Sequence, residues 1–362
     1  QNQLVCREIF VTASLRFISA APIFFLPERS RCCMVADLLP LFCRKKGELV
    51  SEQRLAAIDL GTNTARLLIG TVGADGTIAP DLVVRRITRL GGGFTKELGI
   101  SIEARERTIA ALQEFSAEIR RLGAVSVLAV ATSAVRDAVN GSEFCAAVER
   151  QTGIRLTVID GEREGDLTRA GVYAGLDNRS GTVFIFDVGG GSTEYTLVHE
   201  GDLLFTRSLP LGVVRLTEGK GEPAAMADKI NRELHPLKDA LAGQGLLGRL
   251  SGATLVGTAG TATTLAAISM GMIDYDYRRV NNYVVARPEI IDIYRQLLPL
   301  PPAQRLSVPG MEPGREDLII AGMLVTLQTM ALFGFERMKV SDFGLLEGVL
   351  LWAAEQHDGR HP

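Results

Sequence analysis

Runs of apolar residues separated by short polar turns recur along the chain and predict alternating strands and helices. Residues 55–60 and 66–72 are two apolar runs joined by the turn-like segment GTNTA, which predicts a strand, a tight loop and a second strand. In residues 102–122 the apolar positions recur at helical spacing, and the run ends at Gly123, which is a helix stop signal.

The same pattern predicts the elements of the rest of the chain. Strands are expected at 125–131, 155–160, 182–186 and 254–256, and helices at 141–152 and 162–176. Beyond Val280 the pattern is mostly helical, with a proline-rich break at 298–302.

Two segments of the chain share the same order of apolar and polar residues. AAIDLGTNTARLLIG at 56–70 and FIFDVGGGSTEYTLV at 184–198 both read as an apolar strand, Asp-x-Gly, a small polar loop and a second apolar strand. The offset from Asp59 to Asp187 is about one domain length, which predicts two similar α/β domains that face each other. Each domain should begin with a hairpin rather than a βαβ unit.

Composition narrows the class of protein. The chain has 362 residues, which suggests two domains. Aromatic residues make up 6% and the net charge is −3, so neither a base-stacking surface nor a broad basic face for nucleic acid is expected. Five cysteines without paired spacing exclude a disulfide framework or a zinc site, and four scattered histidines show no catalytic triad.

The first fifty residues differ from the rest of the chain. They hold four of the five cysteines and seven basic against four acidic residues, whereas the remainder is acidic. A signal peptide is one interpretation, but charged residues precede the apolar stretch, Pro22 interrupts it and no clean cleavage site follows. We expect residues 1–50 to be an extension that is disordered or not native, and we place the protein in the cytoplasm.

Two uncharged runs are long enough to be weighed as membrane spans. Residues 252–273 are rich in Gly and Thr, which favours a strand, a loop and a helix start. Residues 318–335 follow Glu316 and Asp317, which suit a helix N-terminus. We predict buried core elements for both runs and no membrane contact.

Three loops rich in Gly, Ser and Thr have the character of phosphate-binding loops. Such loops let backbone N–H groups converge on an anion without a Cβ in the way, and a following helix adds its N-terminal dipole. They lie at 61–65, 189–193 and 257–264, each after a predicted strand. None matches the Walker pattern or a dinucleotide fingerprint.

Carboxylates flank the second of these loops. Asp187 ends one strand and Glu194 starts the next, so a hairpin can point both into one cleft. Two carboxylates beside a phosphate are what Mg²⁺ prefers, although Asp187 can instead cap its loop. Asp59 holds the corresponding position in the first half and is a third candidate for the metal site.

With these residues in place, the sequence resembles the exopolyphosphatase/guanosine pentaphosphate phosphatase family, within the actin-like ATPase superfamily. The matching stretches are IDLGTNTARLLIG, TRLGGGF, ATSAVRDAVN, VIDGEREGDLTRAGV, FDVGGGSTE, LPLGVVRLTE and GTAGTATTLAA. The resemblance implies an α/β fold with two actin-like (ribonuclease H-like) domains and an interdomain cleft. Residues 51–161 with a C-terminal helix at 344–358 would form the first domain and residues 162–343 the second.

The resemblance also implies a catalytic base. The position that matches the family base in GEREGD is Glu164, at the start of a predicted helix. Taken without the resemblance, Glu164 is an acidic residue favoured by the helix dipole. Glu162, two residues away, is the alternative assignment.

The resemblance further implies a set of phosphate-binding residues. For the terminal phosphate these are Gly61, Asn63, Thr64, Arg66, Arg136, Gly190, Gly191, Ser192 and Thr193. For a more distant phosphate they are Gly257, Thr258, Gly260 and Thr261. Arg66 and Arg136 can instead form surface or interdomain ion pairs, and Arg215 is a further candidate.

The expected function is that of an exopolyphosphatase that releases terminal orthophosphate with Mg²⁺ held by Asp187, Glu194 and Asp59. Hydrolysis of pppGpp, replacement of Mg²⁺ by Mn²⁺, stimulation by K⁺ and a homodimer are implied by the resemblance alone. A non-catalytic polyphosphate or alarmone binding protein is the alternative, and a sugar or acetate kinase lacks a motif for its acceptor pocket. Asn281 and Asn282 stand where many relatives are expected to have His, which argues against a polyphosphate contact there. The acidic net charge, and the lack of further domains that would lengthen a basic channel, predict shorter polyphosphate or a nucleotide tetra- or pentaphosphate as substrate rather than very long chains.

Overall fold

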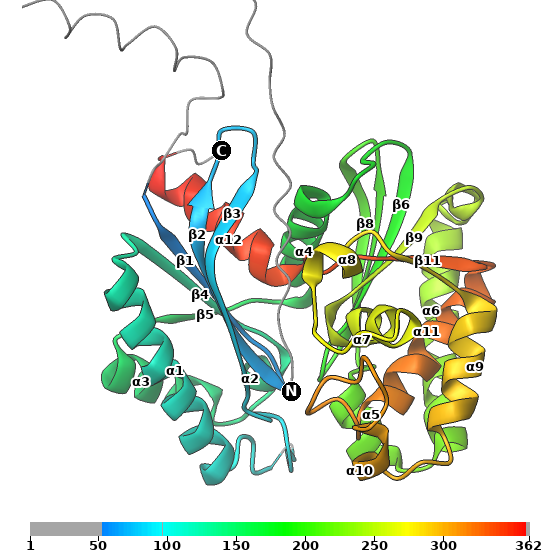
Figure 1. Ribbon diagram of the computed structural model, residues 1–362, viewed down its shortest axis with the longest axis horizontal. Helices are drawn as coiled ribbons and strands as arrows, with labels where there is room; N and C mark the ends of the chain where they lie inside the picture. The colour runs from blue at the N-terminus through cyan, green and yellow to red at the C-terminus, as the bar shows by residue number, and fades with distance from the viewer. Residues whose placement is uncertain (1–52, 96, 360–362) are drawn as a thin grey trace, which may run out of the picture. The chain divides into compact units, whose positions relative to one another are not determined.

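The computed structural model describes residues 53–95 and 97–359, and the predicted extension over residues 1–50 lies outside them (Figure 1). Two β-sheets with helices on their faces make up this part of the chain, so the predicted α/β class with two sheets is confirmed.

The first sheet contains five strands in the order β3-β2-β1-β4-β5. The strands are β1 (Leu55–Leu60), β2 (Thr64–Val72), β3 (Ile78–Ile87), β4 (Ser126–Ala131) and β5 (Leu156–Val158). β1, β2 and β3 form an antiparallel meander, whereas β4 pairs in parallel with β1 and β5 in parallel with β4.

The second sheet repeats this arrangement and adds one strand, in the order β10-β11-β9-β6-β7-β8. The strands are β6 (Thr182–Val188), β7 (Thr193–His199), β8 (Asp202–Leu209), β9 (Thr254–Thr258), β10 (Val284–Ala286) and β11 (Arg337–Val340). β6, β7 and β8 are antiparallel neighbours, and β9 and β11 continue the sheet in parallel. The repeat predicted from the Asp59 and Asp187 segments is thus a repeat of topology, and each half begins with a hairpin.

The helices complete both halves. They are α1 (Ile102–Leu122), α2 (Ser133–Arg136), α3 (Gly141–Thr152), α4 (Gly161–Gly175), α5 (Val213–Lys220), α6 (Pro223–Gly243), α7 (Ala259–Ser269), α8 (Tyr277–Val280), α9 (Arg287–Leu297), α10 (Pro302–Arg305), α11 (Ile319–Phe333) and α12 (Leu345–His357). A short 3₁₀ helix covers Leu247–Leu250.

Capping explains why α1 has the bounds that its sequence predicts. The Ser101 side chain accepts a hydrogen bond from the Ala104 N–H at 3.2 Å, which satisfies a free donor of the first turn. Gly123 ends the helix in the left-handed region with φ of 68°, where a side chain is disfavoured.

Helices α4 and α12 hold the two sheets together. α12 packs against β1, β2 and β4, α4 packs against β7 and β8, and the two helices pack against each other. They cross closely because Gly171 and Gly348 have no side chain: a Cβ on Gly171 would lie 1.9 Å from the backbone oxygen of Gly344, the N-cap of α12, and a Cβ on Gly348 would lie 1.9 Å from that of Leu167 in α4. The packing of α12 on β1, β2 and β4 supports the proposal that the C-terminal helix belongs with the first domain.

Both long uncharged runs are core elements, as predicted. Residues 252–273 divide between β9 and α7, and residues 318–335 contain α11, whose residues are largely buried. Within the described residues, no helix is both long enough and apolar enough to span a membrane.

The region beyond Val280 contains two strands that the pattern analysis did not predict. β10 has three residues and β11 has four. Neither is long enough to show an alternating pattern, and both are fixed by pairing with strands far away in sequence.

Candidate active site

A cavity of about 360 Å³ is lined by loops from both halves of the repeat. Its walls contain most of the residues that the sequence predicted for the site. These are Asp59, Gly61, Asn63, Thr64, Arg66, Glu164, Asp187, Gly190, Gly191, Ser192, Thr258 and Gly260. One cavity therefore collects residues from segments that lie about 200 positions apart in the sequence.

Five predicted site residues do not line this cavity: Arg136, Thr193, Glu194, Gly257 and Thr261. Thr193 donates its hydroxyl to the Leu211 carbonyl at 2.8 Å and is fully buried. Gly257 lies inside β9, and Thr261 packs against Gly322. These three residues pack next to the loops on the side away from the cavity.

Arg215 also lies outside the cavity. Its Nη2 donates to Asp137 Oδ2 at 2.5 Å, and its guanidinium lies 5.7 Å from the centroid of the Phe94 ring. Arg215 thus forms an ion pair between the two halves, which is the alternative role that we considered for the matched arginines.

The hairpin aspartates occupy equivalent positions. Asp59 pairs in register with Arg66 across β1 and β2, and Asp187 pairs with Glu194 across β6 and β7. Burial raises the pKa of Asp59 to about 6, and burial together with the Glu194 charge raises the pKa of Asp187 to about 7. The fold thus places both carboxyls where their negative charge is poorly compensated.

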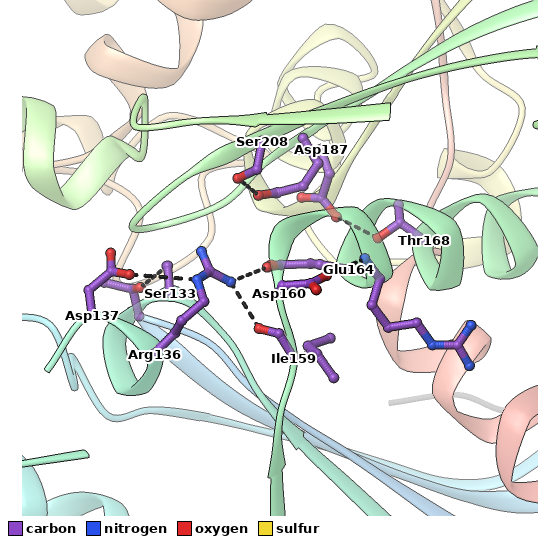
Figure 2. A network of polar contacts seen from close by, with 12 residues as sticks. Ser133, Arg136, Asp137, Ile159, Asp160, Glu164, Thr168, Asp187 and Ser208 are labelled. Atoms are coloured by element: carbon purple, nitrogen blue, oxygen red, sulfur yellow. Dashed lines mark hydrogen bonds and ion pairs between the residues drawn. The ribbon is translucent and has the colours of Figure 1, made fainter. Parts of the chain in front are cut away.

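Glu164 lies in the first turn of α4, beside this cluster. The Asp160 side chain caps the helix by accepting from the Arg163 N–H at 2.8 Å. The glutamate is 7% exposed, and its Oε2 accepts from Arg136 Nη1 at 3.4 Å (Figure 2). Burial and the neighbouring Glu194 and Asp187 raise its pKa well above the usual range.

Arg136 contacts Glu164 and does not line the cavity. Its Nη1 also donates to the Ile159 carbonyl at 3.0 Å, and its Nε lies 3.6 Å from Asp137 Oδ1. Figure 2 shows the guanidinium between Asp137 and Glu164. These contacts fix both the position of the arginine and the orientation of the glutamate.

The glycine loops of the two halves touch at one side of the cavity. A Cβ on Gly191 would lie 2.3 Å from Ser133 Oγ and 2.6 Å from Thr62 Oγ1, so a larger residue would have to displace these hydroxyls. The two hydroxyls are 3.0 Å apart and line the cavity. Thr62 and Ser133 were missed from the sequence, although each lies beside a predicted residue or inside a matched motif.

Asn63 has polar atoms that the protein leaves unpaired. The residue is 4% exposed, yet neither Oδ1 nor Nδ2 has a hydrogen-bond partner among the described residues. Its backbone oxygen accepts from the Thr88 and Arg89 N–H groups at 3.0 and 2.9 Å, which fixes the loop. Buried amides are nearly always paired, so this side chain is suited to a ligand in the cavity.

The third loop meets an arginine that the sequence did not predict. Thr258, Ala259 and Gly260 line the cavity at the N-terminus of α7, and Ala259 has a strained φ of 62°. Arg315 lies against this turn, because a Cβ on Gly260 would be 2.0 Å from its Cζ. Arg315 lies in none of the matched stretches of the sequence, so no local signal pointed to it.

Asn281 and Asn282 do not line the cavity. Both side-chain amides donate to the Gly175 carbonyl, at 2.7 and 2.9 Å, and their oxygens accept from the Asp342 and Asp177 N–H groups. They fasten the end of α4 to neighbouring loops. Both amides are thus engaged within the protein rather than with the cavity.

The donor set at the hairpins fits a cation. Within the described residues no three His, Cys, Asp or Glu side chains are clustered closely enough to hold a metal by themselves. Asp59 and Asp187 nevertheless face one cavity with raised pKa values, and a divalent cation would compensate their charge. Two carboxylates completed by phosphate and water match the coordination of Mg²⁺.

Comparisons with known proteins show which family this chain resembles. Residues 75–357 match the Ppx/GppA phosphatase family. Exopolyphosphatase 2 of Mycobacterium tuberculosis is 34% identical over 320 residues, which cover 82% of this chain and 98% of that protein.

Solved structures give the same result. The Aquifex aeolicus member of the Ppx/GppA family is 32% identical with a TM-score of 0.68, over 86% of this chain and 99% of that one. An exopolyphosphatase from Cytophaga hutchinsonii is 26% identical with a TM-score of 0.75, over 85% and 99%. The family match covers most of this chain and includes Glu164, Asp187 and the two later loops, and we conclude that the chain belongs to the Ppx/GppA phosphatase family.

Proposed function

We propose that the protein is an exopolyphosphatase, which releases terminal orthophosphate from inorganic polyphosphate. The observation that carries the proposal is that Glu164 shares one cavity with the Asp59 and Asp187 hairpins. The names of the similar proteins from Mycobacterium tuberculosis and Cytophaga hutchinsonii support the same activity.

Glu164 acts as the general base. Its carboxylate accepts a proton from a water molecule, the water oxygen attacks the terminal phosphorus, and the bond to the bridging oxygen breaks. The products are orthophosphate and a chain that is one unit shorter. A carboxylate whose pKa is raised by burial binds the proton more strongly, which improves general base catalysis.

Arg136 is a positioning residue in this account. Held by the Ile159 carbonyl and by Asp137, it orients the Glu164 carboxylate without lining the cavity. The predicted phosphate contact of Arg136 is thus replaced by a proposed contact with the base.

The loops hold the terminal phosphate. Residues 61–64 and 190–192 line the cavity from opposite halves, and the unpaired Asn63 amide offers a donor. Arg66, whose Nη2 lies 3.9 Å from Glu347 Oε1, supplies a cation in the same wall. Phosphoryl transfer depends mainly on such positioning and on charge stabilisation.

Asp187 and Asp59 are the residues that would hold Mg²⁺, with Glu194 behind Asp187 on the paired strand. Glu194 Oε1 already accepts from Ser208 Oγ at 2.6 Å, and the residue does not line the cavity, so we assign it no direct bond to the cation. The cation would offset negative charge on the phosphate oxygens.

Hydrolysis of pppGpp to ppGpp is a second candidate activity. The observation that favours it is an apolar part of the cavity wall, formed by Ile78, Pro80, Val83, Tyr275 and Tyr277. Polyphosphate has no group for such a surface, whereas a nucleoside does.

One assay tests both activities. Phosphate release is measured from medium-chain polyphosphate, pppGpp and ATP side by side, with Mg²⁺ and with a chelator. We expect Mg²⁺-dependent release from polyphosphate and little release from ATP. Tight binding of polyphosphate without release would instead support the alternative, a non-catalytic binding protein.

A further inference from the structure

Glu312 places a negative charge inside a cavity that we propose to bind a polyanion. Its Oε2 accepts from Arg85 Nη1 at 2.5 Å and lies 3.7 Å from Arg315 Nε. All three side chains line the cavity and are only partly exposed, with 20%, 28% and 15% of their side-chain surface accessible.

The two arginines come from different halves of the fold. Arg85 lies on β3 of the first sheet, whereas Arg315 lies between α10 and α11. Arg315 is fixed beside the N-terminus of α7 by the space that Gly260 leaves. The pair therefore faces the cavity from two sides, next to the loop predicted to hold a more distant phosphate.

Arg85 and Arg315 share Glu312 as their acidic partner. Within the part of the chain that the structure describes, the ion pairs of Arg85 and Arg315 are both made with Glu312. Burial lowers the pKa of Arg315 to about 10, with Arg85 and Arg66 adding to the effect. The two cations are close together, and Glu312 is the anion that holds them.

We propose that Glu312 is an internal anion that competes with phosphate groups of the substrate for Arg85 and Arg315, and so weakens the binding of polyphosphate. The inference rests on the proposed function, because it assumes that the cavity takes a phosphate chain. A phosphate that reaches the arginines must displace the carboxylate or lie beside it. Glu312 therefore sets the affinity of the site without taking part in the chemical step.

The first test is Glu312→Gln, which keeps the shape and removes the charge. Binding of medium-chain polyphosphate is measured by calorimetry in the Glu164→Gln background, with and without Glu312→Gln. Removing a like charge about 5 Å from a partly exposed anion should tighten binding about fivefold. A KM for polyphosphate that falls by a similar factor in the otherwise native protein is the second readout.

Asp317→Asn is the matched control. Asp317 pairs with Arg89 at 2.9 Å and joins the same two segments of the chain, but it does not line the cavity. Its removal loosens the link between the segments without changing the charge of the cavity, so binding should stay within about twofold.

Three results overturn the inference. Unchanged or weaker binding by Glu312→Gln shows that the carboxylate organises the arginines for the substrate. Equal tightening by Asp317→Asn assigns the effect to the loosened link. Failure of polyphosphate to bind at all excludes the assumed ligand. Tighter binding without any phosphate release by the native protein would keep the inference and reject the proposed catalysis.

Discussion

Single residues in this protein act through the space they leave as well as through their chemistry. Gly191 brings the loop of the second half against Thr62 and Ser133 of the first. A methyl group at this position must displace both hydroxyls and so disturbs the hydrogen bond between them. One substitution therefore probes whether the site depends on contact between the loops.

Gly191→Ala should lower kcat/KM for polyphosphate by about 100-fold, because a displacement near 1 Å is costly in a positioned site. Gly219→Ala is the control: that glycine is exposed in α5 and an added Cβ meets nothing within 4 Å. It should keep full activity and gain up to about 1 kcal/mol of stability. Full activity in Gly191→Ala would show that the loops need not touch.

A second residue-scale prediction concerns Glu347, whose pKa is raised by burial despite the nearby Arg66. The folded protein keeps this proton to a higher pH than the unfolded chain does. Stability is therefore lost as pH rises above the usual pKa of 4.5 toward the folded value. Gln does not titrate, so Glu347→Gln should gain in Tm relative to the native protein across this interval.

Thermal unfolding of both proteins at about pH 4.5 and about pH 7.5 measures this difference. Glu355→Gln, at an exposed position on the same helix, is expected to follow the native protein at both pH values. A Tm difference for Glu347→Gln that does not grow with pH contradicts the account.

Site residues that lie in compact sequence motifs could be predicted, whereas those outside such motifs could not. Asp59, Asp187 and Glu164 were predicted because each lies in a compact motif whose chemistry depends on residue order. Arg85 and Arg315 belong to no such motif. They approach the site only because β3 and the segment after α10 lie beside the cavity, which depends on tertiary packing.

At the scale of elements, α5 connects the loops of both halves. Its Val213 and Val214 N–H groups donate to the Gly189 and Gly190 carbonyls at 3.0 and 2.9 Å. Its other end reaches the first half, where Glu218 Oε2 accepts from the Gly93 N–H at 3.1 Å. The helix therefore couples the second phosphate loop to the TRLGGGF segment.

Arg215→Ala removes the second contact of α5 with the first half, the ion pair to Asp137. We expect KM for polyphosphate to rise about fivefold while stability changes by less than about 1 kcal/mol, since exposed ion pairs contribute little to folding. Arg295→Ala breaks an exposed pair on α9 and should leave KM unchanged. Equal KM values for Arg215→Ala and the native protein would remove α5 from the account.

Elements differed in how well the sequence predicted them. The bounds of α1 and α3 were predicted correctly because both helices have strong periodicity and end at a glycine. The strand expected at 155–160 is reduced to three residues in β5, because it pairs only with β4 at the edge of the sheet. Tertiary pairing, which no local pattern records, decides such short elements.

At the scale of the whole molecule, an acidic protein is proposed to bind a polyanion. The net charge is −3, and the cavity contains Asp59, Glu164, Asp187, Glu312, Asp342 and Glu347 against Arg66, Arg85 and Arg315. Acidic groups outnumber basic ones where phosphate has to bind. A bound cation would offset this imbalance. The homodimer implied by the family resemblance stays a prediction.

Mg²⁺ should therefore stabilise the protein even without substrate. At a concentration 100 times its Kd, a ligand that binds the folded state alone adds about 2.7 kcal/mol, which thermal unfolding in Mg²⁺ and in a chelator detects as a shift in Tm. Asp187→Asn should lose most of this shift, whereas Asp202→Asn, at an exposed position of the same sheet, should keep it. An undiminished shift in Asp187→Asn would exclude Asp187 as a ligand.

The most direct test of the account compares Glu164→Gln with Glu162→Gln. The two positions share the first turn of α4, but Glu164 is buried in the cavity wall and Glu162 is exposed. Phosphate release and polyphosphate binding are measured for both. We predict that Glu164→Gln loses at least about 100-fold in kcat while it still binds polyphosphate, and that Glu162→Gln behaves as the native protein does. Native turnover by Glu164→Gln, or loss of turnover in Glu162→Gln alone, would contradict the assignment of Glu164 as the base.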